Sequence, residues 1–215
     1  MKISNKNLKA GFTLVEILVV LVIIAIIAAF ATPAMNSMIG GSKMSLGAEG
    51  LGRDMNLARQ VAVRDNVPVE FRIYNINDPD QPGNDKKWRS YQAITKNYDP
   101  TNPELVTVEA VTEVKDLPDG LIFHPSTLSS VLTERGPISS SVSTDTNGEA
   151  EKVRQEAYTA FIFMPNGSTS LAKQGLGKLW YLTIVREQEE NSSEPKEMAV
   201  VQIDPFTGKI TQFIK

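Results

Sequence analysis

The sequence predicts an α+β protein in which one long N-terminal helix is followed by an antiparallel β-sheet. Two observations carry this prediction. An uninterrupted apolar run near the N-terminus is continued by a stripe of apolar residues at helical spacing, and from residue 66 onward short alternating segments are separated by turn sequences. The 215 residues allow one main domain with a hydrophobic core of its own beside the N-terminal segment.

The first element has the features of a membrane-spanning helix. Residues 17–31 include no charged or polar side chain, and Phe12 to Met35 would form a helix of about 36 Å, enough for a bilayer core of about 30 Å. Before it come Lys2, Lys6 and Lys9 and no acidic residue. The positive-inside tendency therefore places the N-terminus in the cytoplasm and the bulk of the chain across the membrane.

Glu16 is a lone carboxylate at the start of this apolar run. Membrane insertion of a carboxylate costs about 2.5–3.5 kcal/mol at a helix centre and less near an end, so we expect the residue to have a function. Bulk properties leave two interpretations open. The segment is a signal-anchor, or it is a signal peptide cleaved at Ala29-Phe30-Ala31, which would release a secreted β-domain protein.

A third interpretation rests on a resemblance. The residues Gly11-Phe12-Thr13-Leu14-Val15-Glu16 resemble the processing motif of type IV pilins and type II secretion pseudopilins. In that family a membrane peptidase cuts after the glycine and methylates the new N-terminus. The resemblance implies cleavage between Gly11 and Phe12, N-methylation of Phe12, and Glu16 as the fifth mature residue. Pro33 matches the helix-kinking proline found in many pilins.

The resemblance implies a pilin fold, with a long, partly transmembrane helix packed on an antiparallel β-sheet head. It also implies a structural subunit of a type II secretion pseudopilus or type IV pilus-like filament, without enzymatic activity or cofactor. The implied partners are a prepilin peptidase, other pilins or pseudopilins, an inner-membrane assembly platform with a separate ATPase, and the lipid bilayer before assembly. The implied location is the bacterial inner membrane, with the head in the periplasm, and then the filament, in the periplasm or at the cell surface.

Assembly would use the charges at the start of the helix. A free or methylated amine on Phe12 is a cation, and an unpaired charge in low dielectric is unfavourable. Within one helix, Phe12 and Glu16 lie one turn apart, and between staggered subunits Glu16 of one can neutralise Phe12 of its neighbour. The second pairing would give assembly a register and a driving force. The alternative is that Glu16 only extends to the membrane interface.

The sequence divides into a basic leader and three further parts. These are residues 1–11, the transmembrane half of the helix at 12–35, a glycine-rich and then amphipathic part at 36–65, and a β-rich head at 66–215 with exposed loops at 75–87, 125–152 and 187–197. Each glycine between Gly40 and Gly52 costs a helix about 1 kcal/mol, so this stretch is either a soft helix or a linker.

The amphipathic part predicts one face for packing and one for solvent. Leu51, Met55, Ala58 and Ala62 recur at helical spacing and are expected to pack on a sheet. The polar residues mostly off that stripe are expected to be solvated: Arg53, Asn56, Arg59, Gln60 and Arg64.

The head predicts eight strands. The first alternates Val67, Val69, Phe71 and Ile73 with polar residues and is expected to be half-buried. The others are expected at 89–96, 105–114, 121–124, 158–164, 179–186, 198–203 and 209–214, with turns at 165–168 and 204–208. Residues 126–152 are expected to form an exposed insertion, and 188–196 a charged hairpin tip.

Three of these segments resemble the minor pseudopilin H class and related minor pilins of competence systems. They are the end of the helix with its entry into the first strand (57–69), the strand and turn at 161–168, and the terminal hairpin around Thr207-Gly208-Lys209. A competence- or adhesion-type minor pilin that binds DNA or a surface ligand is therefore an alternative. Against DNA, the final strand offers only Lys209 and Lys215, and Phe206 and Phe213 are expected in the core.

No catalytic, cofactor or metal site is predicted. The absence of cysteine excludes disulfides and thiolate ligands, and the net charge of −3 gives no support for nucleic acid as the main partner. Gly175-Leu176-Gly177-Lys178 lacks phosphate-loop spacing and is expected to be a turn. Residues 145–149 are expected to be a solvated loop rather than a calcium site. His124, the only histidine, is expected to be structural.

Overall fold

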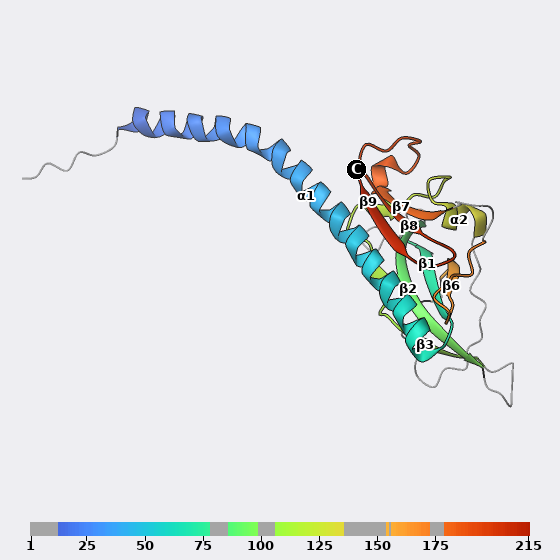
Figure 1. Ribbon diagram of the computed structural model, residues 1–215. Helices are drawn as coiled ribbons and strands as arrows, with labels where there is room; N and C mark the ends of the chain where they lie inside the picture. Colours follow the sequence, from blue (N-terminus) through green and yellow to red (C-terminus); the bar gives the residue numbers. More distant parts are fainter. Residues whose placement is uncertain (1–12, 78–85, 99–105, 136–153, 155, 173–178) are drawn as a thin grey trace, which may run out of the picture. The chain divides into compact units, whose positions relative to one another are not determined.

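The computed structural model describes residues 13–77, 86–98, 106–135, 154, 156–172 and 179–215 (Figure 1). For residues 29–40, 97–98 and 106–107 it describes the backbone only. The chain divides into two compact units, Met1–Gly41 and Ser42–Lys215. Helix α1 (Leu14–Asp65) contributes to both units.

Helix α1 includes the whole glycine-rich stretch at 40–52. The sequence left open whether this stretch is a soft helix or a linker, and the structure shows a helix. Pro33 also lies inside the helix. The kink that the sequence assigns to Pro33 stays a prediction.

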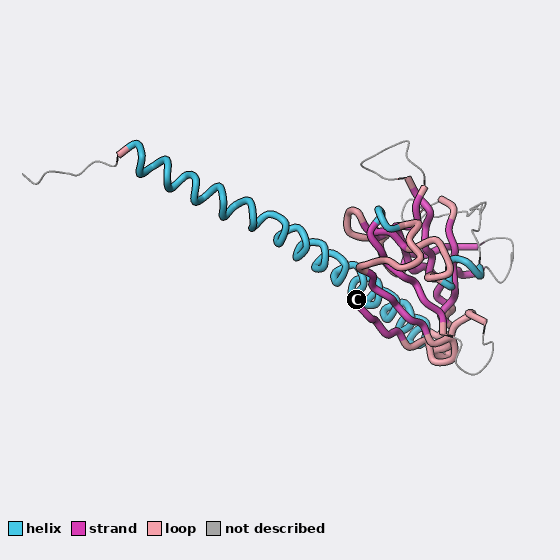
Figure 2. The backbone as a smooth tube through the Cα atoms, turned by 90° about the horizontal axis from the view of Figure 1, so that it is seen from above, coloured by secondary structure: helices cyan, strands magenta, loops and turns pink. Residues whose placement is uncertain are grey.

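The second unit holds two antiparallel sheets, which Figure 2 shows in magenta. The first has the order β3-β2-β1-β6, with β4 also paired to β2, and the second the order β5-β7-β8-β9. The strands of the first sheet are β1 (Val69–Ile76), β2 (Lys87–Tyr98), β3 (Val106–Ala110), β4 (Lys115–Asp116) and β6 (Tyr158–Phe163). The second sheet consists of β5 (Leu121–Phe123), β7 (Trp180–Arg186), β8 (Met198–Ile203) and β9 (Ile210–Ile214). With the short helices α2 (Ser130–Arg135) and η2 (Glu187–Glu189), this is the predicted α+β fold.

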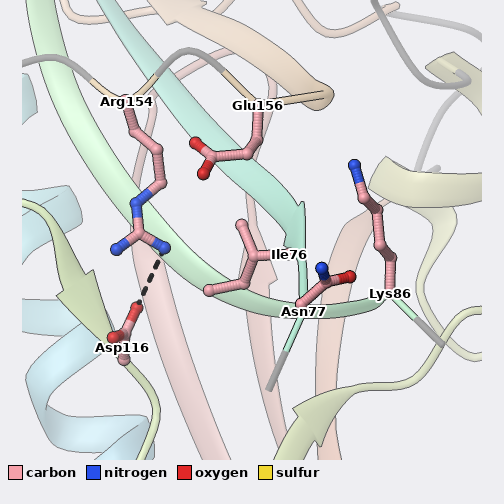
Figure 3. A pocket seen from close by; sticks show the side chains of 6 residues that line it. All are labelled: Ile76, Asn77, Lys86, Asp116, Arg154 and Glu156. Carbon is pink, nitrogen blue, oxygen red and sulfur yellow. Dashed lines mark ion pairs between the residues drawn. The ribbon is translucent and has the colours of Figure 1, made fainter. Parts of the chain in front are cut away.

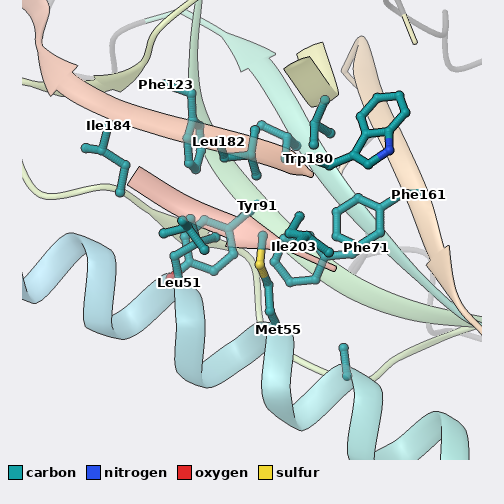
Figure 4. Packing of buried hydrophobic residues seen from close by; sticks show 14 of the residues in the cluster. Leu51, Met55, Phe71, Tyr91, Phe123, Phe161, Trp180, Leu182, Ile184 and Ile203 are labelled. Atoms are coloured by element: carbon teal, nitrogen blue, oxygen red, sulfur yellow. The ribbon is translucent and has the colours of Figure 1, made fainter. Parts of the chain in front are cut away.

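The core of this unit lies where α1 meets both sheets (Figure 4). The predicted helical stripe is confirmed, since Leu51, Met55, Ala58 and Ala62 are all fully buried. Around them lie side chains from the first sheet, such as Phe71, and from the second, such as Leu182 and Ile203. The two sheets and the last turns of α1 therefore share one hydrophobic core.

Strand β1 is buried on both faces, so the prediction of a half-buried strand was wrong. Its polar face carries Glu70 and Arg72, joined by an ion pair of 2.6 Å between Oε1 and Nε. Lys96 Nζ lies 2.6 Å from the other Glu70 oxygen, and the Arg72 guanidinium lies over the Tyr158 ring at 4.2 Å. Burial raises the pKa of neighbouring Tyr74 to about 12. The alternation of apolar and polar residues identifies the two faces of a strand. It does not show whether the polar face carries ion pairs that allow it to be buried.

The expected exposed insertion at 126–152 is wrong for its first part. Ser130, Val131 and Leu132 of α2 are buried. Where β5 ends, two serine hydroxyls accept hydrogen bonds from the open edge of β7, Ser129 Oγ from Thr183 N at 3.0 Å and Ser130 Oγ from Tyr181 N at 2.9 Å. This segment therefore extends the sheet edge through side chains. Residues 136–152 lie outside the described part of the chain.

The two predicted turns are present and pack against each other. Gly167 and Gly208 have positive φ, +81° and +62°. A Cβ on Gly208 would lie 2.4 Å from the carbonyl oxygen of Gly167. Arg59 Nε donates to the carbonyls of Thr207 at 2.9 Å and Gly167 at 3.3 Å, so Arg59 is not the solvated residue that helical spacing suggested.

An ion pair between a buried carboxylate and a partly exposed lysine also joins α1 to the first sheet. Asp54 is 3% exposed, and Lys115 Nζ donates to both of its carboxylate oxygens at 2.9 and 2.8 Å. Burial and the neighbouring Asp54 carboxylate raise the pKa of Tyr91. On another side of the helix, a Cβ on Gly52 would lie 1.7 Å from Gln212 Nε2, so this glycine permits the close approach of β9.

Gly208→Ala should destabilise the protein more than Gly120→Ala. Both glycines have positive φ, which costs alanine about 1 kcal/mol or more, but Gly120 has open space around a Cβ whereas Gly208 would meet a backbone oxygen. We expect a loss of about 1 kcal/mol for Gly120→Ala and about 3 kcal/mol for Gly208→Ala. Urea unfolding of the full chain in detergent, followed by Trp88 and Trp180 fluorescence, measures both. Equal losses would contradict the turn-to-turn packing.

Lys115→Met should cost more stability than Asp54→Asn. Loss of the lysine leaves a buried carboxylate without its cation, at a cost of about 3 kcal/mol. Loss of the carboxylate leaves a lysine whose side chain is 41% exposed and can turn to water, at a cost of about 1 kcal/mol. The same unfolding assay applies. Lys43→Met, which removes a 3.9 Å pair to the exposed Asp119, is the control and should change stability by less than about 0.5 kcal/mol.

Candidate functional site

The start of α1 is a capping box formed by Thr13 and Glu16. Thr13 Oγ1 accepts a hydrogen bond from Glu16 N at 3.2 Å, and Thr13 N donates to Glu16 Oε2 at 3.4 Å. Ile17 N donates to the Thr13 carbonyl at 3.3 Å, as expected for the first helical turn. The Thr-x-x-Glu spacing is the sequence signal for a capping box. The interpretation of Glu16 from the sequence as an assembly residue does not include this capping function.

The capping box gives Glu16 a local structural function in the isolated chain. The carboxylate accepts the N–H of Thr13, directly before the first helical residue, and the helix dipole also favours negative charge in this first turn. Gly11 and Phe12, the predicted cleavage and methylation residues, lie outside the described residues. The pairing of Glu16 with Phe12 therefore stays a prediction.

The helix that follows exposes apolar side chains on every side. Between 49% and 81% of each large apolar residue from Leu14 to Ile27 is exposed. Within the part of the chain whose side chains are described, no helix combines the length and apolar character needed to cross a membrane. An apolar surface of this extent is typical of a segment that binds lipid or other proteins.

His124 is held in the head by local hydrogen bonds. It is 1% exposed, its Nδ1 accepts from Ser126 N at 3.3 Å, and its Nε2 lies 3.0 Å from the Ser192 carbonyl oxygen. Both nitrogens are therefore used to connect the loops around them, as expected for a structural histidine. The described residues include no cluster of histidine and carboxylate side chains that could hold a metal ion.

A pocket of about 300 Å³ lies beside the end of β1 (Figure 3). It is lined by Ile76, Asn77, Lys86, Asp116, Arg154 and Glu156. Arg154 Nη1 and Asp116 Oδ1 are 3.7 Å apart, so two of the charged groups partly neutralise each other. The lining has no histidine or hydroxyl nucleophile and we assign it no chemistry. The predicted turn at 175–178 and the loop at 145–149 lie outside the described part of the chain.

The expectation that Phe206 and Phe213 belong to the core was wrong. Their side chains are 55% and 54% exposed. Phe206 lies in the turn before β9, and Phe213 lies in β9, which is at the end of its sheet among the described strands. The alternating pattern alone could not tell that the sheet ends at this strand.

Comparison with known proteins identifies the N-terminal segment. Residues 6–32, which include the predicted cleavage site and Glu16, match the family model of the prokaryotic N-terminal methylation motif. A sequence search of curated proteins finds no match. Among solved structures, the chain is similar to the minor pseudopilin EpsH from the type 2 secretion system of Vibrio cholerae, with a TM-score of 0.42 and 11% identity, over 80% of this chain and 97% of that one. The chain thus carries a prokaryotic N-terminal methylation motif, which confirms the predicted resemblance to type IV pilins and pseudopilins at its N-terminus.

Proposed function

We propose that this chain is a non-enzymatic structural subunit of a type II secretion pseudopilus or type IV pilus-like filament. The observation that carries the proposal is the methylation motif at 6–32, followed directly by a helix with exposed apolar side chains on every side. Such a surface is stable only when it is covered. Lipid would cover it before assembly, and the helices of neighbouring subunits would cover it in the filament.

Processing would begin at the cytoplasmic face of the inner membrane. A prepilin peptidase would cleave between Gly11 and Phe12, remove the leader with its three lysines, and methylate Phe12. The head would lie in the periplasm. An assembly platform and a separate ATPase would then move the subunit from the bilayer into the filament, since this chain contains no phosphate-binding loop of its own.

Glu16 would have two functions, one within the subunit and one between subunits. The Glu16 carboxylate accepts hydrogen bonds from Thr13 N at 3.4 Å and from Thr13 Oγ1 at 3.5 Å. Both end on Oε2, so the contacts among the described residues leave Oε1 open. In the filament, Oε1 would accept a hydrogen bond from the charged N-terminal amine of Phe12 in a neighbouring subunit. The capping box would hold the carboxylate in place for that contact, which reduces the entropy lost on assembly.

Co-expression with a prepilin peptidase should yield a mature chain that begins with N-methylated Phe12. Mass spectrometry of the purified protein identifies this terminus directly. Gly11→Val should leave the leader attached, because it replaces the glycine after which the peptidase of the resembling family cuts. A mature N-terminus near Thr32 would instead show cleavage of a conventional signal peptide and would contradict the proposal.

Glu16→Gln should separate the two functions of this residue. Glutamine can also close a capping box, so the helix start should be kept while the charge is lost. We expect normal cleavage and a loss of incorporation into filaments of about tenfold or more, because a buried charge loses its partner. Quantitative immunoblotting of sheared filaments against membranes measures the incorporated fraction.

Thr13→Val is the matched variant. It removes the capping hydroxyl, at a cost of about 1 kcal/mol to the helix start, but keeps the Glu16 charge. We expect normal cleavage and a loss of incorporation well below tenfold, because the charge is kept and the Thr13 N–H still holds the Glu16 carboxylate. If Glu16→Gln incorporates normally while Thr13→Val does not, Glu16 acts through capping and the pairing mechanism is wrong.

A further inference from the structure

Among the described strands, β9 forms one end of the second sheet and is paired along one edge only, with β8. Lys215 N donates to the Met198 carbonyl at 2.9 Å, and Asp204 N donates to the Lys209 carbonyl at 3.0 Å. Both pairs fit the antiparallel register of β8 and β9, in which Val200 lies opposite Phe213. Since hydrogen-bonded pairs alternate along such a ladder, the odd-numbered residues of β9 bond to β8.

The backbone groups of the even-numbered residues therefore point to the other side. These are the N–H and C=O groups of Ile210, Gln212 and Ile214, and no described strand pairs with them. The end of the strand is also apolar and open, because Phe213 and Ile214 are 54% and 51% exposed. An apolar strand edge of this kind is a template for pairing with another chain.

Charge selects among the strands that could pair there. Lys209 and Lys215 flank β9 and share the face of Phe213, because residues two apart along a strand point to the same side. If a second copy paired antiparallel about Gln212, Lys209 of each copy would lie opposite Lys215 of the other. Like charges in directly opposite positions destabilise a strand pair, which disfavours this occupant.

We propose that β9 binds an extended segment of a partner protein as an additional antiparallel strand of the second sheet. The segment carries an apolar residue opposite Phe213 and acidic residues opposite Lys209 and Lys215, six positions apart. Backbone hydrogen bonds to Ile210, Gln212 and Ile214 supply the binding, and the lysines select the partner and set its register. The inference rests on the head alone and does not depend on the proposed filament function.

Single-stranded nucleic acid is a different class of ligand that the same side chains could bind. The exposed rings of Phe206 and Phe213 could stack on bases, and the two lysines could contact phosphates. The free backbone edge distinguishes the two, because alternating N–H and C=O groups match another strand. We therefore assign the edge to a polypeptide, and an oligonucleotide serves as a test of that choice.

A designed peptide tests the proposal on the full chain in detergent micelles. The labelled peptide Glu-Thr-Phe-Thr-Val-Thr-Glu places its acids opposite the two lysines and its aromatic residue opposite Phe213. Fluorescence anisotropy should show saturable binding, at least about tenfold tighter than that of the same peptide with lysine at both ends. N-methylation of the three threonine amides should abolish binding, because these groups face the edge of β9.

Variants of the protein test the two contributions separately. The double variant Lys209→Glu/Lys215→Glu should reverse the preference, so that the lysine-ended peptide binds more tightly. Gln212→Pro removes an N–H from the free edge but none from the ladder with β8, and it should weaken binding at least about tenfold. Lys196→Glu changes an exposed charge outside β9 and should leave both affinities unchanged.

Four results of the binding experiments would overturn the proposal. They are the absence of saturable binding to the acidic peptide, equal affinity for the two peptides, and binding that survives amide methylation. The fourth is tighter binding of a single-stranded oligonucleotide that the acidic peptide does not displace. Sedimentation velocity of the chain without peptide tests for a second copy at the edge. A dimer that the Gln212→Pro variant no longer forms would assign the edge of β9 to a second copy instead.

Discussion

The head depends on burying one face of α1 between two sheets. Six apolar positions of the helix, from Met44 to Ala62, are at most 1% exposed, and they contact side chains from both sheets within one cluster. Without the helix, the apolar face that Leu182 and Ile203 share with it would meet water. The last part of α1 is therefore a structural part of the head, and it cannot leave without exposing the core.

Helix α1 can be buried in this way because the strands and turns of the head approach it closely. Glycines and paired polar side chains make that close approach possible. Gly52 lets Gln212 lie against the helix backbone, and Gly208 lets two turns meet under Arg59. Asp54 and Lys115 satisfy each other where the helix meets the first sheet. Apolar burial thus supplies most of the free energy, while these contacts specify one position of the helix.

The two ends of α1 differ in how apolar side chains are distributed around the helix. The residues from Ile17 to Ile27 are apolar on all sides, whereas the end of the helix has one buried stripe and a polar side with residues such as Gln60 and Arg64. The first pattern is typical of a segment that binds lipid or other proteins, and the second packs on the sheets of the head. A single helix with these two patterns fits the proposed filament subunit, whose head folds on the buried part of the helix.

The sequence by itself determined the α+β class, the apolar stripe of α1, most strand positions and the N-terminal motif, because each follows from periodicity or spacing along the chain. Only the tertiary structure decided what β1 and Arg59 contact, that Ser129 and Ser130 extend a sheet edge, and that Phe213 lies at the end of a sheet. Those outcomes depend on which segments meet in space. Burial of Glu70 with Arg72, for example, requires partners such as Lys96 from another strand, and a one-dimensional pattern does not contain that pairing.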